Sequence, residues 1–327
     1  SIADKLDGGK GIDTLRLIDS DNTTAGYELA IPVAASIKNI EIIDIIGNAG
    51  VTANTTSIDG VTHLYTTSTG ANTSTAAATT NINATATGAA AGAEAIAVEG
   101  GKDVTVVSKN NIADTIAVGA TTTAAGKVSV TSTGGTANGD TQGNIAVTGG
   151  TEITVNQYAG NAAAIGNNTI GGTVTVTGNA STTTVTVNQT ATATGANATA
   201  TTAGVVGYTA GTVTIADVNA GTANANTIST VTLKNAGAAT VDSNALSTLN
   251  LEGTLVTVNT TNSSIATTPA VTTLALNLKG ATSTGAVTAD AEVTTLNVKS
   301  STTDSTLNTW LNTRMVKAIS PLWKALI

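Results

Sequence analysis

The residues with the clearest chemistry lie near the start of the sequence, in the segment Gly8-Gly9-Lys10-Gly11-Ile12-Asp13-Thr14-Leu15-Arg16. This segment has the pattern G-G-x-G-x-D-x-U-x, in which U is a large apolar residue. The glycines permit a turn whose carbonyl oxygens point inward, and the aspartate adds a carboxylate to that turn. Carbonyl and carboxylate oxygens are the ligands that Ca²⁺ prefers in proteins. The segment therefore predicts a calcium site or, alternatively, a glycine-rich turn without metal.

The nonapeptide resembles the calcium-binding repeat of the RTX family, whose members leave bacterial cells by type I secretion. In that family, the turn of one repeat and the aspartate of a neighbouring stacked repeat share each calcium ion. The resemblance implies that Ca²⁺ is the cofactor of this chain. It also implies a turn and carboxylate set made of Gly8, Gly9, Gly11 and Asp13.

The sequence contains one complete copy of the motif, so the resemblance implies that further ligands come from outside it. Asp4 precedes the motif and is the equivalent of Asp13 one repeat earlier, although Ile2 stands where that repeat would have a glycine. Asp19 and Asp21 follow the motif and are the available substitutes for ligands of a neighbouring repeat. We therefore include Asp4, Asp19 and Asp21 among the candidate metal ligands.

The composition argues against several other kinds of function. None of the 327 residues is Cys, one is His, 2% are aromatic, and the formal net charge is −8. Without Cys the chain forms no disulfide, and with one His it has little material for a nucleophile, base and acid constellation. Basic patches and stacking aromatic side chains are missing too, so nucleic acid is not an expected partner. No apolar run reaches the ~18 residues of a membrane-spanning helix. We expect neither an enzyme nor a membrane span.

A short pattern recurs through the middle of the sequence, in which Val, Ile or Leu alternates with Thr, Ser or Asn. Such alternation predicts strands with one buried and one solvent-facing side. Successive copies begin 11 to 28 residues apart, and every spacing but one falls between 18 and 28. The copies are Val104–Val106, Val128–Val130, Ile153–Val155, Val174–Val176, Val185–Val187, Val213–Ile215, Val231–Leu233, Leu249–Leu251, Leu274–Leu276 and Leu296–Val298.

This repeat predicts an all-β fold. A mean spacing of about 22 residues suits one coil of a solenoid, whose coils stack at ~4.8 Å and pair strand on strand. We predict a right-handed parallel β-solenoid (β-helix) with irregular coils of about 18–28 residues and a short C-terminal helical tail. The alternative is a string of β-sandwich domains. Such domains usually have aromatic cores, and the only aromatic residues between Tyr65 and Trp310 are Tyr158 and Tyr208.

Charge and composition divide the chain into three predicted zones. Residues 1–60 hold nine of the 21 acidic residues and are assigned to one or more acidic RTX-like coils. Residues 61–304 are rich in Thr, Ala, Gly and Asn and form the solenoid body. Residues 305–327 are apolar and basic, and spacings such as Leu307 to Trp310 and Leu311 predict an amphipathic helix. We favour a cap over the open sheet edges for this helix, and membrane-surface or partner binding is the alternative.

In composition and motif, the chain resembles the surface-layer proteins of Gram-negative bacteria, of the type I-secreted kind found in Caulobacter and Campylobacter. The resemblance implies a secreted structural protein that assembles with itself into a calcium-assisted lattice on the bacterial cell surface. Cell-surface polysaccharide is a second candidate partner. The alternatives are a secreted β-solenoid adhesin for host or glycan receptors and a β-helix enzyme acting on polysaccharide. Such an enzyme needs a carboxylate pair, for which Asp290 and Glu292 are near each other in sequence.

Overall fold

The computed structural model describes residues 5–19, 28–31, 36–88, 95–135, 137, 139–160, 168–190, 207–263, 270–301, 304–311 and 317–319. Every regular element in these ranges is a β-strand, and no helix occurs in them. The chain divides into two compact units. Unit 1 comprises residues 1–150, 157–172 and 191–208, and unit 2 comprises residues 151–156, 173–190 and 209–327. Two strands cross a boundary, and we assign each to the unit that holds most of it.

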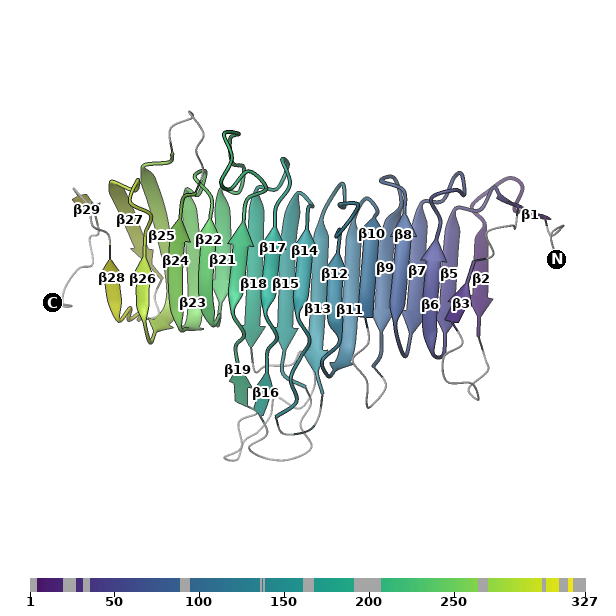
Figure 1. The fold of residues 1–327 in the computed structure, drawn as a ribbon, viewed down its shortest axis with the longest axis horizontal. Helices are drawn as coiled ribbons and strands as arrows, with labels where there is room; N and C mark the ends of the chain where they lie inside the picture. The colour runs from purple at the N-terminus through teal and green to yellow at the C-terminus, as the bar shows by residue number, and fades with distance from the viewer. Residues whose placement is uncertain are drawn as a thin grey trace. The chain divides into compact units, whose positions relative to one another are not determined.

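Unit 1 consists of two sheets in which successive strands of the chain alternate. One sheet has the order β2-β5-β7-β9-β11-β13 and the other β3-β6-β8-β10-β12-β14, and two short pairs, β1-β4 and β16-β19, stand apart. The strands of each sheet lie side by side in chain order (Figure 1). Their bounds are β1 (Lys5–Asp7), β2 (Thr14–Ile18), β3 (Glu28–Ala30), β4 (Ser36–Lys38), β5 (Ile42–Gly47), β6 (Gly50–Asn54), β7 (His63–Ser68), β8 (Asn72–Ala76), β9 (Asn81–Ala86), β10 (Ala95–Gly100), β11 (Val104–Asn111), β12 (Thr115–Val118), β13 (Val128–Gly134), β14 (Ile145–Thr148), β16 (Asn168–Ile170) and β19 (Gly207–Thr209).

Unit 2 has the same plan. Its sheets have the orders β15-β18-β21-β23-β25-β27-β29 and β17-β20-β22-β24-β26-β28. The strands are β15 (Glu152–Tyr158), β17 (Val174–Thr177), β18 (Thr184–Thr190), β20 (Val213–Ala216), β21 (Thr230–Lys234), β22 (Ala238–Asp242), β23 (Thr248–Leu255), β24 (Thr257–Thr261), β25 (Thr273–Ser283), β26 (Ala286–Thr288), β27 (Thr295–Ser300), β28 (Thr309–Leu311) and β29 (Lys317–Ile319).

Strands pair in parallel, and the offset between paired residues is irregular. In unit 1 the offset is successively 28, 21, 18, 22 and 24 positions, for the pairs Thr14 with Ile42, Ile42 with His63, His63 with Asn81, Ile82 with Val104, and Val104 with Val128. These values lie within the range predicted from the sequence. All-β structure with long parallel sheets is therefore confirmed, and the arrangement is compatible with a β-solenoid.

The core consists of aliphatic side chains aligned from strand to strand. Along five strands of unit 1 the column runs Ile43, Leu64, Ile82, Val104 and Val128, and each of these residues is at most 2% exposed. Buried and partly exposed positions alternate along the strands, as in β9 and β13. Branched aliphatic residues suit such strands because they pack well on a pleated surface, so this interior is filled without Phe.

Two buried glutamine side chains form hydrogen bonds with the backbone groups of glycine residues. Gln157 Nε2 donates to the carbonyl oxygen of Gly172 at 3.3 Å, and the amide of Gly237 donates to Gln189 Oε1 at 3.2 Å. A Cβ on Gly237 would lie 2.4 Å from the carbonyl oxygen of Gly211, so no side chain fits there. The glutamines thus satisfy backbone groups that close packing removes from water.

We expect Gln189→Met to lower the free energy of unfolding by about 1–2 kcal/mol, because the substitution leaves the buried amide of Gly237 without an acceptor. The matched control is Asn188→Ala on the same strand. Among the described residues, the Asn188 side chain bonds to the partly exposed Asn156 alone, at 3.4 Å, so its loss should cost less than about 0.5 kcal/mol. Urea unfolding of both variants checks this expectation, and equal losses would contradict the role given to Gln189.

The predicted C-terminal helix is wrong at the tail residues that the structure describes beyond Asn308. Thr309–Leu311 is strand β28 and Lys317–Ile319 is strand β29, and these strands pair with β26 and β27. The exposed edge of a parallel sheet offers unpaired backbone groups, and pairing with that edge overrides the helical spacing of the apolar side chains. Residues 312–316 and 320–327 lie outside the described part. Within the ranges the structure describes, we find no helix with the length and apolarity needed to cross a membrane.

Candidate metal centre

The glycine motif forms a tight turn between β1 and β2. Gly9 and Gly11 have φ angles of +86° and +127°, in the region that glycine adopts at low cost. A Cβ on Gly8 would lie 2.1 Å from the carbonyl oxygen of Asn39, and the amide of Gly8 donates to the carbonyl oxygen of Lys38 at 3.1 Å. The turn therefore needs glycine both for its backbone angles and for its contact with the segment after β4.

The carboxylate of Asp13 folds back over this turn. A Cβ on Gly8 would lie 2.8 Å from the Asp13 Cγ, and one on Gly11 would lie 4.0 Å from Asp13 Oδ2. Asp13 Oδ2 is shielded from solvent and has no hydrogen-bond donor among the residues that the structure describes. A buried acceptor without a partner costs free energy, and a bound cation would remove this cost. The Asp13 carboxylate thus lies beside the glycine turn, and the metal site stays a prediction.

Glu41 is a neighbour of this turn that the sequence analysis missed. Its Oε2 accepts a hydrogen bond from the backbone amide of Asp13 at 2.8 Å. The Glu41 carboxylate therefore lies against the backbone of Asp13, although 28 positions separate the two residues in the chain. The only signal in the sequence was that residues 37–40, just before Glu41, have the form of the strand repeat.

Asp7 stabilises the turn from its other side and was not predicted to do so. Its Oδ1 accepts hydrogen bonds from Asn39 Nδ2 at 2.7 Å and from the Gly9 amide at 3.0 Å. The Asn39 and Gly9 bonds, helped by the Lys38 ammonium, hold the pKa of Asp7 below its usual value. Because this pKa is lower in the folded chain, the stabilisation is present above the unfolded value and is lost as the pH falls through the folded value.

The remaining predicted ligands are not brought to the turn by the described structure. Asp19 follows the last residue of β2, and six residues of extended chain place it about 20 Å from Asp13. Asp4 and Asp21 lie outside the described residues. No group of three Asp, Glu or His side chains comes together for a metal in the part of the chain that is described. The carboxylates that the described structure leaves for a cation at this turn are those of Asp13, beside Gly8 and Gly11, and of Glu41, which contacts the Asp13 amide.

The comparison with models of protein families found no match to the sequence. The comparison with curated proteins likewise found none.

Proposed function

We propose that this chain is part of a structural surface-layer protein, a right-handed parallel β-solenoid that assembles with itself into a calcium-assisted lattice on the bacterial cell surface. The observation that carries the proposal is the combination of two features. One is the glycine turn that presents the shielded Asp13 oxygen, and the other is a repetitive polar face on stacked parallel strands. Such a protein acts by presenting the same contacts many times.

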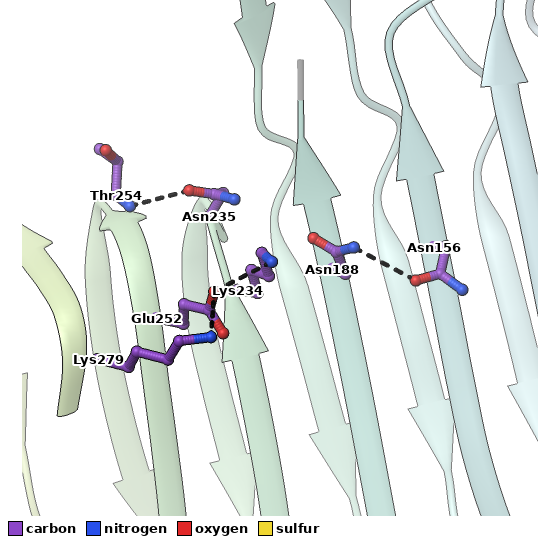
Figure 2. Close-up of polar contacts among 7 residues, drawn as sticks. All are labelled: Asn156, Asn188, Lys234, Asn235, Glu252, Thr254 and Lys279. Carbon is purple, nitrogen blue, oxygen red and sulfur yellow. Dashed lines mark hydrogen bonds and ion pairs between the residues drawn. The ribbon is translucent and has the colours of Figure 1, made fainter. Parts of the chain in front are cut away.

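The outward faces of the sheets support repeated contacts. Asn188 Nδ2 donates to Asn156 Oδ1 at 3.4 Å between β18 and β15 (Figure 2). Asn250 Nδ2 donates to Thr232 Oγ1 at 3.0 Å, which extends this kind of ladder to β21 and β23. These bonds lie within one chain, and they show that similar polar side chains recur on the outward face. A contact between copies through such side chains would add about 1 kcal/mol net, and many of them would add up through multivalency.

Calcium has two roles in the proposal. At the turn, it would neutralise Asp13 and Glu41 and complete the coordination of the shielded oxygen. On the whole chain, whose formal net charge is −8, divalent cations would reduce the repulsion that opposes close packing of copies. We give the chain no catalytic role. The Asp290 carboxylate, half of the acid pair suggested by the sequence, accepts a hydrogen bond from the Glu292 amide at 2.8 Å and shapes its own loop.

Thermal unfolding with calcium and with chelator tests the metal site. Calcium at 100 times its Kd should stabilise the folded chain by about 2.7 kcal/mol and raise the Tm by several degrees. Asp13→Ala should remove most of this gain. The matched control is Asp59→Ala, because Asp59 is exposed, and this variant should keep the gain. Calcium-independent unfolding of the unaltered chain would overturn the site.

Assembly is tested separately by light scattering and electron microscopy. We expect a monomer in chelator and extended sheets in millimolar calcium, with Asp13→Ala needing more calcium to assemble. Isolated, unassembled particles in calcium would overturn the lattice proposal. If those particles also bound a host or glycan receptor, the adhesin would replace it.

A further inference from the structure

A shallow groove crosses the outward face of the sheet formed by β21, β23, β25 and β27 in unit 2. Its volume is about 320 Å³, which is at the lower end of the range for small-molecule sites. None of the described residues that line it is aromatic, and its lining combines Leu251 and Leu278 with polar and charged side chains. The residues that line it and carry the argument are Thr232, Asn250, Glu252, Asn277, Lys279 and Lys299.

Cations dominate the groove and its border. Lys234 Nζ and Lys279 Nζ lie 3.1 Å and 3.3 Å from the same oxygen of Glu252, so one carboxylate meets two ammonium groups (Figure 2). Lys299 on β27 pairs in register with Asn277 on β25 and adds a third cation. Three lysines against one glutamate give a local charge of +2 in a chain whose net charge is −8. This local excess favours an anionic ligand.

Glu252 remains ionised between these lysines. Partial burial raises its pKa, but the hydrogen bonds from Lys234 and Lys279 outweigh that effect and bring the pKa below its usual value. The two lysines bind Oε1, and its second oxygen, Oε2, has no donor among the described residues. A carboxylate with an open oxygen accepts hydrogen bonds from hydroxyl groups but repels a purely anionic group.

The amides beside Glu252 are oriented by a chain of hydrogen bonds. Asn277 Nδ2 donates to Asn250 Oδ1 at 2.8 Å, and Asn250 Nδ2 donates to Thr232 Oγ1 at 3.0 Å. This direction leaves the carbonyl oxygen of Asn277 as a second acceptor without a donor among the described residues.

Backbone geometry also holds the end of the groove in place. Gly253 and Gly280 follow Glu252 and Lys279 with φ angles of +70° and +55°, and Asn235 Oδ1 accepts the Thr254 amide at 3.0 Å (Figure 2).

We propose that this groove binds an acidic sugar unit, one with a carboxylate and free hydroxyls, within a polysaccharide. The sugar carboxylate would lie between the ammonium groups of Lys279 and Lys299. Its hydroxyls would donate to the open oxygens of Glu252 and Asn277. A neutral sugar would leave the cations unused, and a simple inorganic anion would leave the acceptors unused and face the Glu252 charge. The binding of an acidic sugar is inferred from the residues of the groove. That this sugar belongs to a cell-surface polysaccharide rests on the proposed function.

The test is calorimetric titration of the full chain with galacturonic acid oligomers, in chelator so that calcium cannot bridge carboxylates. Neutral galactose oligomers and inorganic phosphate are the comparison ligands. We expect binding of the acidic oligomer alone, and this binding should weaken as salt increases. Equal binding of the neutral oligomer or of phosphate would overturn the assignment to an acidic sugar. Absence of binding by the acidic oligomer would overturn the site.

Variants locate the binding. Lys279→Gln and Lys299→Gln should each weaken binding about tenfold, the fold-change of a 1.4 kcal/mol loss, and Lys299→Arg should keep most of it. The control is Lys102→Gln, which removes the same charge from an exposed turn in unit 1. If Lys102→Gln weakens binding as much as the groove variants do, the groove is the wrong place. All these titrations use the monomer in chelator, so loss of binding and loss of calcium-dependent assembly are separate results.

Discussion

Replacement of Asp217 by alanine should lower the free energy of unfolding by about 3 kcal/mol. Asp217 is 2% exposed and lies directly after β20. One of its oxygens accepts hydrogen bonds from the backbone amides of Thr227 and Ile228 at 2.6 Å and 2.9 Å. The other accepts a hydrogen bond from the backbone amide of Asn219 at 3.0 Å. Alanine would leave these donors without a partner in the loop that leads to β21. Hydrogen bonds to a charged group contribute about 1.5–3 kcal/mol each, and part of the loss is recovered by water entering the loop.

Urea unfolding of two variants and a control measures this effect. Asp217→Asn retains a carbonyl oxygen and should lose roughly half as much as Asp217→Ala. Asp304→Ala removes an exposed carboxylate from the same unit and should change the free energy by less than about 0.5 kcal/mol. A loss below about 1 kcal/mol in Asp217→Ala would show that the loop does not depend on this carboxylate.

Gly143→Ala should destabilise unit 1 by about 3 kcal/mol because two backbone segments touch at this residue. An added Cβ would lie 2.0 Å from the carbonyl oxygen of Asp114. These two segments cannot separate easily, because Asn111 Oδ1 accepts hydrogen bonds from the backbone amides of both Gly143, at 2.9 Å, and Asp114, at 3.2 Å. Asn111 Nδ2 also donates to the Asp114 carbonyl oxygen at 3.0 Å. Overpacking of a well-packed site costs about 1–3 kcal/mol, and breaking the Asn111 hydrogen bonds places this case at the upper end.

Gly139→Ala is the matched control in the same loop. Its added Cβ would have no atom of the described residues within 4 Å, apart from its chain neighbours, and its φ angle is +84°. The cost there should be confined to backbone strain, about 1 kcal/mol. The difference between the two variants in thermal or urea unfolding therefore isolates the close backbone contact. Equal losses would mean that unit 1 relaxes around Gly143.

Strand positions were predictable because alternation of side chains is a local property. The pattern at Leu249–Leu251 marks inward Leu and outward Asn on one strand, and the structure has this arrangement. The assignment of strands to sheets was not predictable in the same way. Val174–Val176 and Val185–Val187 look like successive copies spaced by 11 residues, but they lie in β17 and β18, which belong to different sheets of unit 2. A strand of either sheet has one buried face, so the pattern alone does not distinguish them.

The candidate sites also contain features that the local sequence determines and features that depend on contacts between distant residues. The sequence by itself determined the alternation that buries Val, Ile and Leu, and the glycine turn with Asp13 beside it. Period-two side-chain placement and the positive φ angles of Gly9 and Gly11 depend on neighbours in the chain. Only the tertiary structure decided that Glu41 reaches Asp13, that residues 309–311 and 317–319 pair as strands, and that Lys234 and Lys279 converge on Glu252. Those contacts join residues at least 18 positions apart, and the register of stacked parallel strands, which no local pattern encodes, determines which residues meet.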